Sequence, residues 1–443
     1  MNKLSLMMAT AMGLVAASAA QAENIAIVGG TVHTMGTAGT VEGATVLIEG
    51  TTIKAVGADV TVPEGFRVVD AKGKVVTPGL MNAYTRLGVT EVGAVSSTND
   101  HTINGYRGGR GGSNAVDAKF SAAFDISYGF NPQTSLIPIL RLEGMTRAVV
   151  VPGVGRTSLF GGQAAVADLS GDWESINKAG AAQVAVLGQD GAGRAGGARG
   201  GAMFMFVSAL KEAEAFARRG SKGLSARESD GFMNAMDAKA LVPVVKGDMP
   251  IYVAVHRASD ILQLIKLQDD FPKVDFVILG GAEGHMVADE IAAAGIPVVV
   301  DPAQNLPHQF DRLGSTLNNA GRLSKAGVKV ILAAKNMDTG ANARLVTQSA
   351  GIAVAHGMDW NAAMQAITVN PASVFGIGDT YGSLEVGMDA DVVVWDGDPL
   401  EVMTTVEFVT VKGEEKSLET RQTKLRDRYM DLTQSDRPFA FNK

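Results

Sequence analysis

The stretch that decides the fold is Pro78-Gly79-Leu80-Met81-Asn82-Ala83-Tyr84-Thr85-Arg86-Leu87-Gly88, which separates two unlike patterns. On its N-terminal side, short β-branched runs alternate with glycine, at residues 25–28, 31–35, 44–50 and 52–57. Such runs predict a small antiparallel β-module. On its C-terminal side, strand-like and helix-like segments alternate, which indicates βα units and a parallel sheet.

The βα alternation is clearest between Pro250 and Gly357. Four predicted strands are rich in Val and Ile with little alternation, at residues 251–255, 276–279, 296–300 and 328–332. That composition suits a sheet buried on both faces. Predicted helices follow them, at residues 259–267, 283–294, 309–326 and 341–355. We interpret the four strands as the last four of an eight-stranded barrel.

Length and composition limit the class of protein. The 443 residues are 46% hydrophobic and 19% charged, which is a globular composition. A barrel of roughly 250 residues plus a smaller module fits this length. The 39 Lys and Arg against 46 Asp and Glu give a net charge of −7, so we expect no nucleic-acid partner. Without cysteine, the chain has neither a disulfide nor a thiolate metal site.

The N-terminus has the features of a signal peptide. A positive start is followed by the apolar run 4–16, and Ala20-Gln21-Ala22 supplies the small-x-small pattern before Glu23. The apolar run is shorter than the roughly 20 residues that a membrane span needs. We therefore predict cleavage after Ala22 and a periplasmic or secreted protein without membrane contact. An uncleaved membrane anchor is the alternative.

Five segments carry a resemblance to a known family. Residues 78–88 resemble the P-G-L-(I/F)-D-x-H-x-H-x-G run that opens the barrel of amidohydrolase-superfamily enzymes. Residues 382–394 resemble the stretch that closes their β-sandwich. Three further segments resemble runs of the imidazolonepropionase-like branch, at residues 150–166, 256–261 and 368–372. The resemblance covers most of residues 24–410.

The resemblance implies an α/β fold, a (β/α)8 TIM barrel with a composite β-sandwich domain formed from both chain ends. The expected divisions are a signal peptide at 1–22, the sandwich at 23–77 plus 378–412, the barrel at 78–377 and a C-terminal tail at 413–443. The implied function is hydrolysis of C–N bonds other than peptide bonds. Cyclic amides and N-acyl or dipeptide-like small molecules are the implied substrates.

The metal-ligand positions of the family are mostly substituted. In active relatives a histidine pair on strand one, histidines after strands five and six and an aspartate after strand eight hold one or two divalent metals. Here Tyr84 and Arg86 occupy the positions of the histidine pair. Gly280 stands where a histidine is usual after strand six, and Lys335 lies at or next to the position of the aspartate. A guanidinium offers no lone pair. Activity would require Zn²⁺ or another divalent metal, yet we expect none tightly bound, or one weak site through His256.

Seven residues are the candidates for the site. The catalytic candidates are Tyr84, Arg86, His256 and Lys335, and the substrate-binding candidates are His101, His308 and Arg257. The competing interpretation of His101 and His308 is that they are polar loop residues. The remaining histidines, at positions 33, 285 and 356, are interpreted as surface, packed or capping residues.

Three functional hypotheses stay open at this stage. The first is the metal-dependent hydrolase implied by the resemblance. The second is a catalytically inactive paralogue that binds a small anion through Arg86 and Lys335, or serves as a partner subunit. Such a subunit would form a homo-oligomer or a hetero-oligomer with an active homologue. The third is metal-independent hydrolysis with Tyr84 or Lys335 as the base.

Three segments have two interpretations each. The Gly/Arg-rich stretches 105–113 and 191–201 are either disordered surface insertions or a lid over the barrel mouth. The charged run 414–428 predicts either a solvated helix or an extended segment that wraps the barrel.

Overall fold

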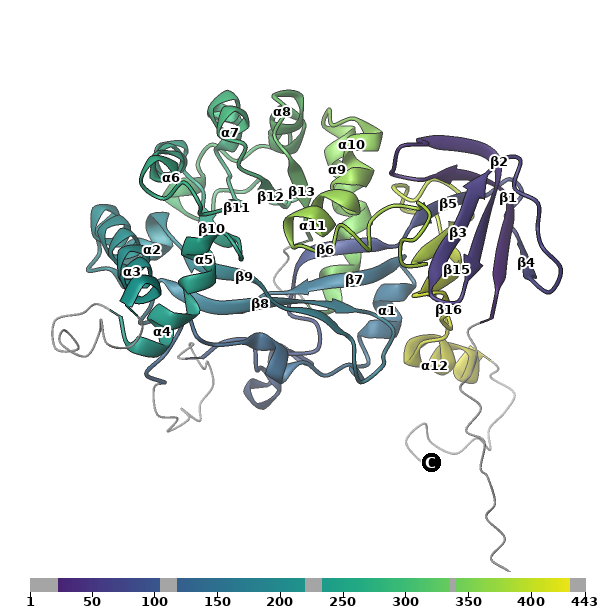
Figure 1. Ribbon diagram of the computed structural model, residues 1–443, viewed down its shortest axis with the longest axis horizontal. Helices are drawn as coiled ribbons and strands as arrows, with labels where there is room; N and C mark the ends of the chain where they lie inside the picture. Colours follow the sequence, from purple (N-terminus) through teal and green to yellow (C-terminus); the bar gives the residue numbers. More distant parts are fainter. Residues whose placement is uncertain (1–22, 104–117, 220–232, 335–339, 431–443) are drawn as a thin grey trace, which may run out of the picture.

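The computed structural model describes residues 23–103, 118–219, 233–334 and 340–430. Figure 1 shows a barrel-like body beside a smaller β-domain. The predicted signal peptide, the first Gly/Arg-rich stretch and Lys335 lie outside the described residues. Within the described part, no helix is long and apolar enough to cross a membrane.

The smaller domain is built from both ends of the chain. Its eight strands are β1 (Ile25–His33), β2 (Thr40–Glu49), β3 (Thr52–Gly57), β4 (Arg67–Asp70), β5 (Val75–Pro78), β14 (Val392–Trp395), β15 (Val406–Val411) and β16 (Glu414–Glu415). They run in the order β16-β15-β14-β5-β1-β2-β3, with β4 paired to β1. The N- and C-terminal halves meet where β5 pairs antiparallel with β14. Buried Ile, Val and Leu side chains from both halves share one core.

The larger domain contains the second eight-stranded sheet. Its strands follow the chain in order: β6 (Leu80–Thr85), β7 (Met145–Val150), β8 (Phe160–Asp168), β9 (Ile176–Val186), β10 (Ile251–Val255), β11 (Phe276–Gly280), β12 (Val298–Val300) and β13 (Val330–Leu332). The last strand, β13, lies beside the first, β6, so the sheet nearly closes. The predicted fold class, a TIM barrel plus a composite β-sandwich domain, is confirmed.

One strand departs from the ideal (β/α)8 pattern. Strand β8 runs antiparallel to both β7 and β9, whereas the other neighbouring strands are parallel. Only residues 151–159 and 169–175 join these three strands. A parallel connection needs about a dozen residues or more, usually a helix, so these short links allow only hairpins.

Helices cover the outside of the barrel on the side of β10–β13 (Figure 1). Helix α6 (Ala258–Asp270) lies where predicted, whereas the predicted helix 341–355 is divided into η6 (Ala341–Leu345) and α9 (Val346–Ala355). The predicted helix 283–294 is divided into η4 (Gly284–Met286) and α7 (Ala288–Ala294). The predicted helix 309–326 is wrong over its first half, where η5 (Phe310–Arg312) leads into a loop and only α8 (Asn319–Lys325) is α-helical. Gly314, Ser315 and Thr316 interrupt the helix here.

The remaining helices surround the barrel or follow it. They are η1 (Ser96–Thr98), η2 (Ile126–Gly129), α1 (Ile137–Arg141), α2 (Gly188–Arg194), α3 (Arg199–Arg219), α4 (Ala235–Ala240), α5 (Val242–Lys246), α10 (Trp360–Gln365), α11 (Val369–Val374) and α12 (Arg421–Met430). Helix α12 has no buried residue, as expected for a solvated helix in this part of the tail.

The second Gly/Arg-rich stretch is not a disordered insertion. Residues 191–201 fall in α2, a short turn and the start of α3. Gly191 lets α2 approach the preceding strand, because a Cβ there would lie 2.8 Å from the Val186 carbonyl oxygen. Arg194 donates from Nε to the Gly155 carbonyl over 2.8 Å. Because α2 follows the C-terminal end of β9, the stretch lies at the barrel mouth.

A buried ion network joins the barrel to the β-domain. Arg147 on β7 is 1% exposed and contacts Asp168 at 3.2 Å, Asp389 at 2.9 Å and Asp391 at 3.1 Å. Lys412, beyond β15, contacts Asp168 at 2.8 Å. Burial raises the pKa of Asp391 against the opposing effect of Arg147. Three carboxylates and two cations therefore compensate one another between the two domains.

Candidate functional site

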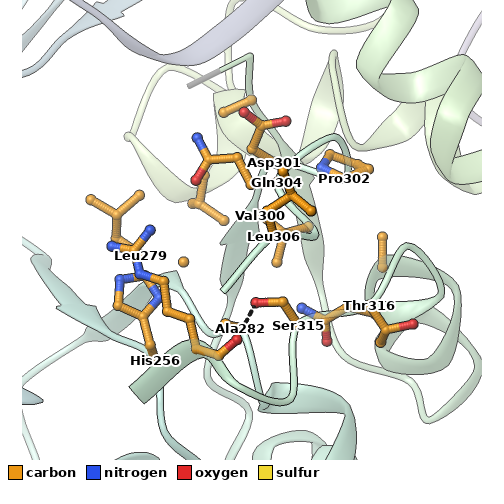
Figure 2. Close-up of a pocket in the computed structure, with 16 residues that line it drawn as sticks. His256, Leu279, Ala282, Val300, Asp301, Pro302, Gln304, Leu306, Ser315 and Thr316 are labelled. Carbon is orange, nitrogen blue, oxygen red and sulfur yellow. Dashed lines mark hydrogen bonds between the residues drawn. The ribbon is translucent and has the colours of Figure 1, made fainter. Parts of the chain in front are cut away.

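The C-terminal ends of four parallel strands converge on one pocket (Figure 2). His256 follows β10, Gly280 ends β11, Asp301 follows β12 and Ala333 follows β13. Parallel strands end at the same edge, which is where TIM-barrel enzymes place their active sites. The pocket contains about 600 Å³ of empty space, a volume that includes space open to solvent.

The lining of this pocket combines apolar and polar side chains. Leu279, Val299, Val300, Pro302 and Leu306 contribute apolar surface. The polar lining comes from the strand ends, from the segment between β12 and α8, and from the first residue of α8: His256, Asp301, Gln304, Arg312, Ser315, Thr316 and Asn319. Small-molecule sites likewise combine an apolar lining with polar groups that fix the orientation of the ligand.

Gly280 and His256 share one space. Gly280 has a φ of 100°, a left-handed conformation that favours glycine. A Cβ built on it would lie 2.2 Å from Cε1 of the His256 ring. His256 itself is 6% exposed. The imidazole of His256 therefore fills the volume that any side chain at position 280 would need, and a second imidazole cannot project from position 280 beside it.

Tyr84 and Arg86 lie at the C-terminal end of β6, as the sequence predicts for strand one. Tyr84 is 8% exposed and belongs to the apolar cluster inside the barrel, with Leu279 and Ala333. The Nε atom of Arg86 is buried and has no hydrogen-bond partner within the described residues. Neither side chain lines the pocket around His256.

His101 lies near Arg86. Its Nδ1 is 3.0 Å from Thr90 Oγ1. Burial and, to a smaller extent, the positive charge of Arg86 lower the pKa of His101 to about 4. His101 is therefore a neutral ring at physiological pH and could accept or donate one hydrogen bond through each nitrogen, depending on the tautomer. Arg86 and His101 form a second polar group at the rim.

The other candidates are placed apart from this pocket. Arg257 is the N-cap residue of α6, and its guanidinium contacts Asp260 at 2.9 Å. Asp260 also contacts Arg199 at 3.2 Å, so Arg257 belongs to an ion-pair network at the helix start. His308 is exposed on the β12–α8 loop and does not line the pocket. Of the six candidates that lie within the described residues, the pocket contains His256 alone.

Sequence reasoning missed Arg312. The residue ends η5 and lines the pocket, but the sequence pattern placed it inside a continuous helix at 309–326. The signal that could have found it is Gly314-Ser315-Thr316, a helix-breaking triplet two residues after Arg312 and shortly beyond the C-terminal end of a barrel strand.

The rim residues that the structure describes do not fit the metal centre that the resemblance implies. Across the described residues, no three or more His, Cys, Asp or Glu side chains gather as ligands. Position 280 has no space for an imidazole, and Arg86 cannot coordinate a cation. The side chains of the described residues at the rim therefore support no chemical step that passes through a bound metal ion.

Comparison with known proteins finds similarity to amidohydrolases in sequence and in structure. The sequence model described as "Amidohydrolase family" matches residues 265–418. The crystal structure of an amidohydrolase from Thermotoga maritima MSB8 is 26% identical, with a TM-score of 0.75 over 89% of this chain and 99% of that one. Molinate hydrolase, at 20% identity, has a TM-score of 0.53 over 90% of this chain and 95% of that one.

A curated relative is similar over much of this chain. It is amidohydrolase tasK from Hapsidospora irregularis, 22% identical over 392 residues, which are 80% of this chain. The chain spans only 37% of that relative's length. Three observations point to the same fold and the same site at the barrel mouth: the family match, the structural similarity across both domains and the pocket at the C-terminal rim. The chain thus resembles amidohydrolases in sequence over residues 265–418 and in fold over both domains.

Proposed function

We propose that this protein is an exported hydrolase of small molecules that cleaves C–N bonds other than peptide bonds. Cyclic amides and N-acyl or dipeptide-like compounds are the proposed substrates. The structural similarity to an amidohydrolase across the barrel and the β-domain, with the family match at residues 265–418, carries the proposal. The pocket of His256 and Asp301 supports it, because it opens at the rim where barrel enzymes hold their substrates.

The proposed active site is atypical for the superfamily. The His256 ring occupies the space beside Gly280, and Arg86 brings a permanent positive charge to the end of strand one. A hydrolase of this kind would bind metal weakly, through His256 at most, or would work without it. Metal dependence is therefore the property to measure together with activity.

The decisive experiment combines an activity screen with elemental analysis. The secreted protein, whose N-terminus should be Glu23, is assayed on hydantoins, N-acyl amino acids and dipeptides, with and without a chelator. We expect slow amide hydrolysis that the chelator does not abolish. Activity that disappears with chelator and returns with Zn²⁺, at one or two equivalents per chain, would overturn the atypical site. The absence of hydrolysis on every substrate would overturn the hydrolase.

A second candidate function is a catalytically inactive barrel that binds a small anion or acts as a partner subunit. The buried Nε of Arg86, which has no partner in the described part of the chain, favours it. Binding of small carboxylates, measured at two salt concentrations, together with no hydrolysis would support it. Size-exclusion chromatography alone and with an active homologue tests the subunit role, and a persistent monomer would contradict that role.

A further inference from the structure

Arg312 presents a guanidinium to the pocket at the barrel mouth. It lines the same pocket as His256, Gly280 and Asp301. Its Nε is buried and has no hydrogen-bond partner among the described residues, and Arg312 forms no ion pair there. A buried donor without a partner costs free energy, and a guanidinium carries five donors in a fixed planar arrangement. Both properties are typical of a guanidinium whose missing hydrogen-bond acceptors are supplied by a bound anion.

The segment that carries Arg312 is held from the side of α2. Gln309 donates from Nε2 to Asp190 Oδ1 over 2.9 Å. Asp311, 1% exposed, accepts from the backbone N–H of Gln189 over 3.2 Å. Asp311 directly precedes Arg312, and Gln309 is three residues before it. They fix the start of η5 against the helix that follows β9.

The same segment is held from the side of β11. Glu283 accepts from the Gly314 N–H over 3.3 Å and from the Ala258 N–H over 3.0 Å. Asn319 donates from Nδ2 to the Gly281 carbonyl over 2.9 Å. Ser315 donates from Oγ to the Arg312 carbonyl over 2.7 Å, which closes the turn (Figure 2). Arg312 therefore stands on a loop that is fixed before any ligand arrives.

The neighbouring acids do not neutralise this guanidinium. Both carboxylate oxygens of Glu283 accept from backbone amides, and Asp311 is directed to α2. Asp301 also lines the pocket, but Figure 2 shows it on the opposite side from His256 and Ser315. Arg312 and Asp301 form no ion pair with each other, and apolar Leu279, Val299 and Val300 are also in the lining.

We propose that Arg312 binds the carboxylate of a small ligand whose compact apolar part lies against Leu279, Val299 and Leu306. The inference rests on the proposed function in one respect, that the ligand site is the barrel mouth. It deepens that function by naming the ligand class, small monocarboxylates such as N-acyl amino acids. A planar guanidinium matches a carboxylate through two parallel hydrogen bonds, which a neutral amide cannot reproduce.

The test measures binding rather than turnover. N-acetyl-L-leucine and its neutral analogue N-acetyl-L-leucinamide are titrated calorimetrically into the wild-type protein and its variants. We expect Arg312→Ala to weaken binding of the acid by about tenfold or more, the usual effect of losing a charge-assisted hydrogen bond. Arg312→Lys should restore part of the affinity, because it keeps the charge but not the planar geometry. Binding of the amide should be weak and the same in all variants.

Arg322→Ala is the matched control, because it removes one positive charge from the exposed face of the following helix α8. It should bind the acid as the wild type does. Inorganic phosphate is the third probe, and it should compete with the acid in the wild type only. Equal affinity of Arg312→Ala and the wild type for the acid, or no binding of the acid to the wild type, overturns the inference. So does tight binding of phosphate alone, which would assign the site to a free inorganic anion.

The outcomes separate this inference from the proposed hydrolase. Binding of the acid that depends on Arg312, without hydrolysis of any substrate, supports the inference while the hydrolase fails. Hydrolysis with an unchanged KM in Arg312→Ala supports the hydrolase and overturns the inference about Arg312. Thermal unfolding of each variant shows whether the fold is retained, and Arg312→Lys keeps the test decisive if Arg312→Ala unfolds.

Discussion

Gly280 and His256 illustrate how one backbone position limits the chemistry of the rim. The left-handed conformation of Gly280 and the imidazole packed against it leave no room for a side chain. The sequence shows that residue 280 is glycine. The need for glycine arises from a contact between the ends of two neighbouring strands, β10 and β11. That contact excludes a second imidazole at position 280 and packs the His256 ring against the end of β11.

Substitution of Gly280 by Ala should therefore destabilise the protein. A Cβ at 2.2 Å from His256 Cε1, in a left-handed backbone, is expected to lower the free energy of unfolding by about 2 kcal/mol or more. Urea denaturation measures it. Gly193→Ala is the control, because Gly193 is exposed within α2 and a Cβ there would meet nothing within 4 Å. That variant should be neutral or slightly stabilising, and an equal loss in both would contradict the steric explanation.

The pair of Arg86 and His101 makes a prediction about pH. Burial, and secondarily Arg86, lower the pKa of His101 to about 4. The unfolded chain takes up a proton near pH 6.5, which the folded ring resists. The resulting stability is fully present above pH 6.5 and is lost as the pH falls toward 4. Arg86→Gln should raise the pKa of His101 while leaving it below 6.5, because burial remains the larger cause.

Nuclear magnetic resonance titration of the His101 ring protons measures this pKa directly. Arg156→Gln is the matched control, since it removes the same charge from an exposed position on the loop after β7. The control should leave the pKa of His101 unchanged. An unchanged pKa in Arg86→Gln as well would show that the two side chains do not interact.

At the scale of elements, the segment between β12 and α8 decides where Arg312 points. The sequence pattern predicted one long helix at 309–326, but the structure has a 3-10 turn, a loop and a short helix. A continuous helix would direct Arg312 along its own surface. The break at Gly314 instead allows Glu283 to hold the turn against the ends of β10 and β11.

Glu283 should therefore act as a positioning residue for this loop. Glu283→Ala leaves two backbone N–H groups without their acceptor, and we expect a loss of about 2 kcal/mol or more in the free energy of unfolding. Amide hydrogen exchange should accelerate around residues 312–316. Glu290→Ala, an exposed acid on α7, is the control and should change neither quantity appreciably. Unaltered exchange in Glu283→Ala would mean that other contacts hold the turn.

At the scale of the whole molecule, the barrel and the β-domain share buried charges. Arg147 belongs to the barrel, whereas Asp389 and Asp391 precede β14 of the β-domain. Removing one partner of such a network leaves uncompensated charges in a poorly solvated place. The two domains should consequently unfold together, because neither satisfies these groups alone.

Arg147→Ala should lower the free energy of unfolding by about 3–5 kcal/mol, since it leaves Asp168 and Asp391 buried without their main cation. Denaturant unfolding followed by two probes, one in each domain, measures the loss. Arg344→Ala breaks an ion pair with Glu143 at 3.4 Å whose side chains are 39% and 32% exposed. That control should cost at most about 1 kcal/mol. A similar small loss in Arg147→Ala would show that the network contributes little.

The sequence determined the architecture because secondary structure and burial depend on local periodicity. Strands at 251–255, 276–279 and 328–332 could be predicted from runs of Val and Ile. The return of the chain's end to the β-module was implied by the resemblance of residues 382–394 to the family. The resemblance to the superfamily further implied that these strands form a closed barrel beside a β-sandwich made from both chain ends. The antiparallel β8 was not predicted, because the short links 151–159 and 169–175 carry no periodic signal.

The site was decided only by tertiary structure, because it is made where ends of separate strands meet. His256 and Gly280 are 24 positions apart in sequence, and the volume they share exists only once β10 and β11 pair in register. Arg312 enters the pocket through contacts with α2 and the end of β11, none of which has a local sequence pattern. Periodicity reports which side of an element is buried, whereas long-range packing sets which side chains face one another.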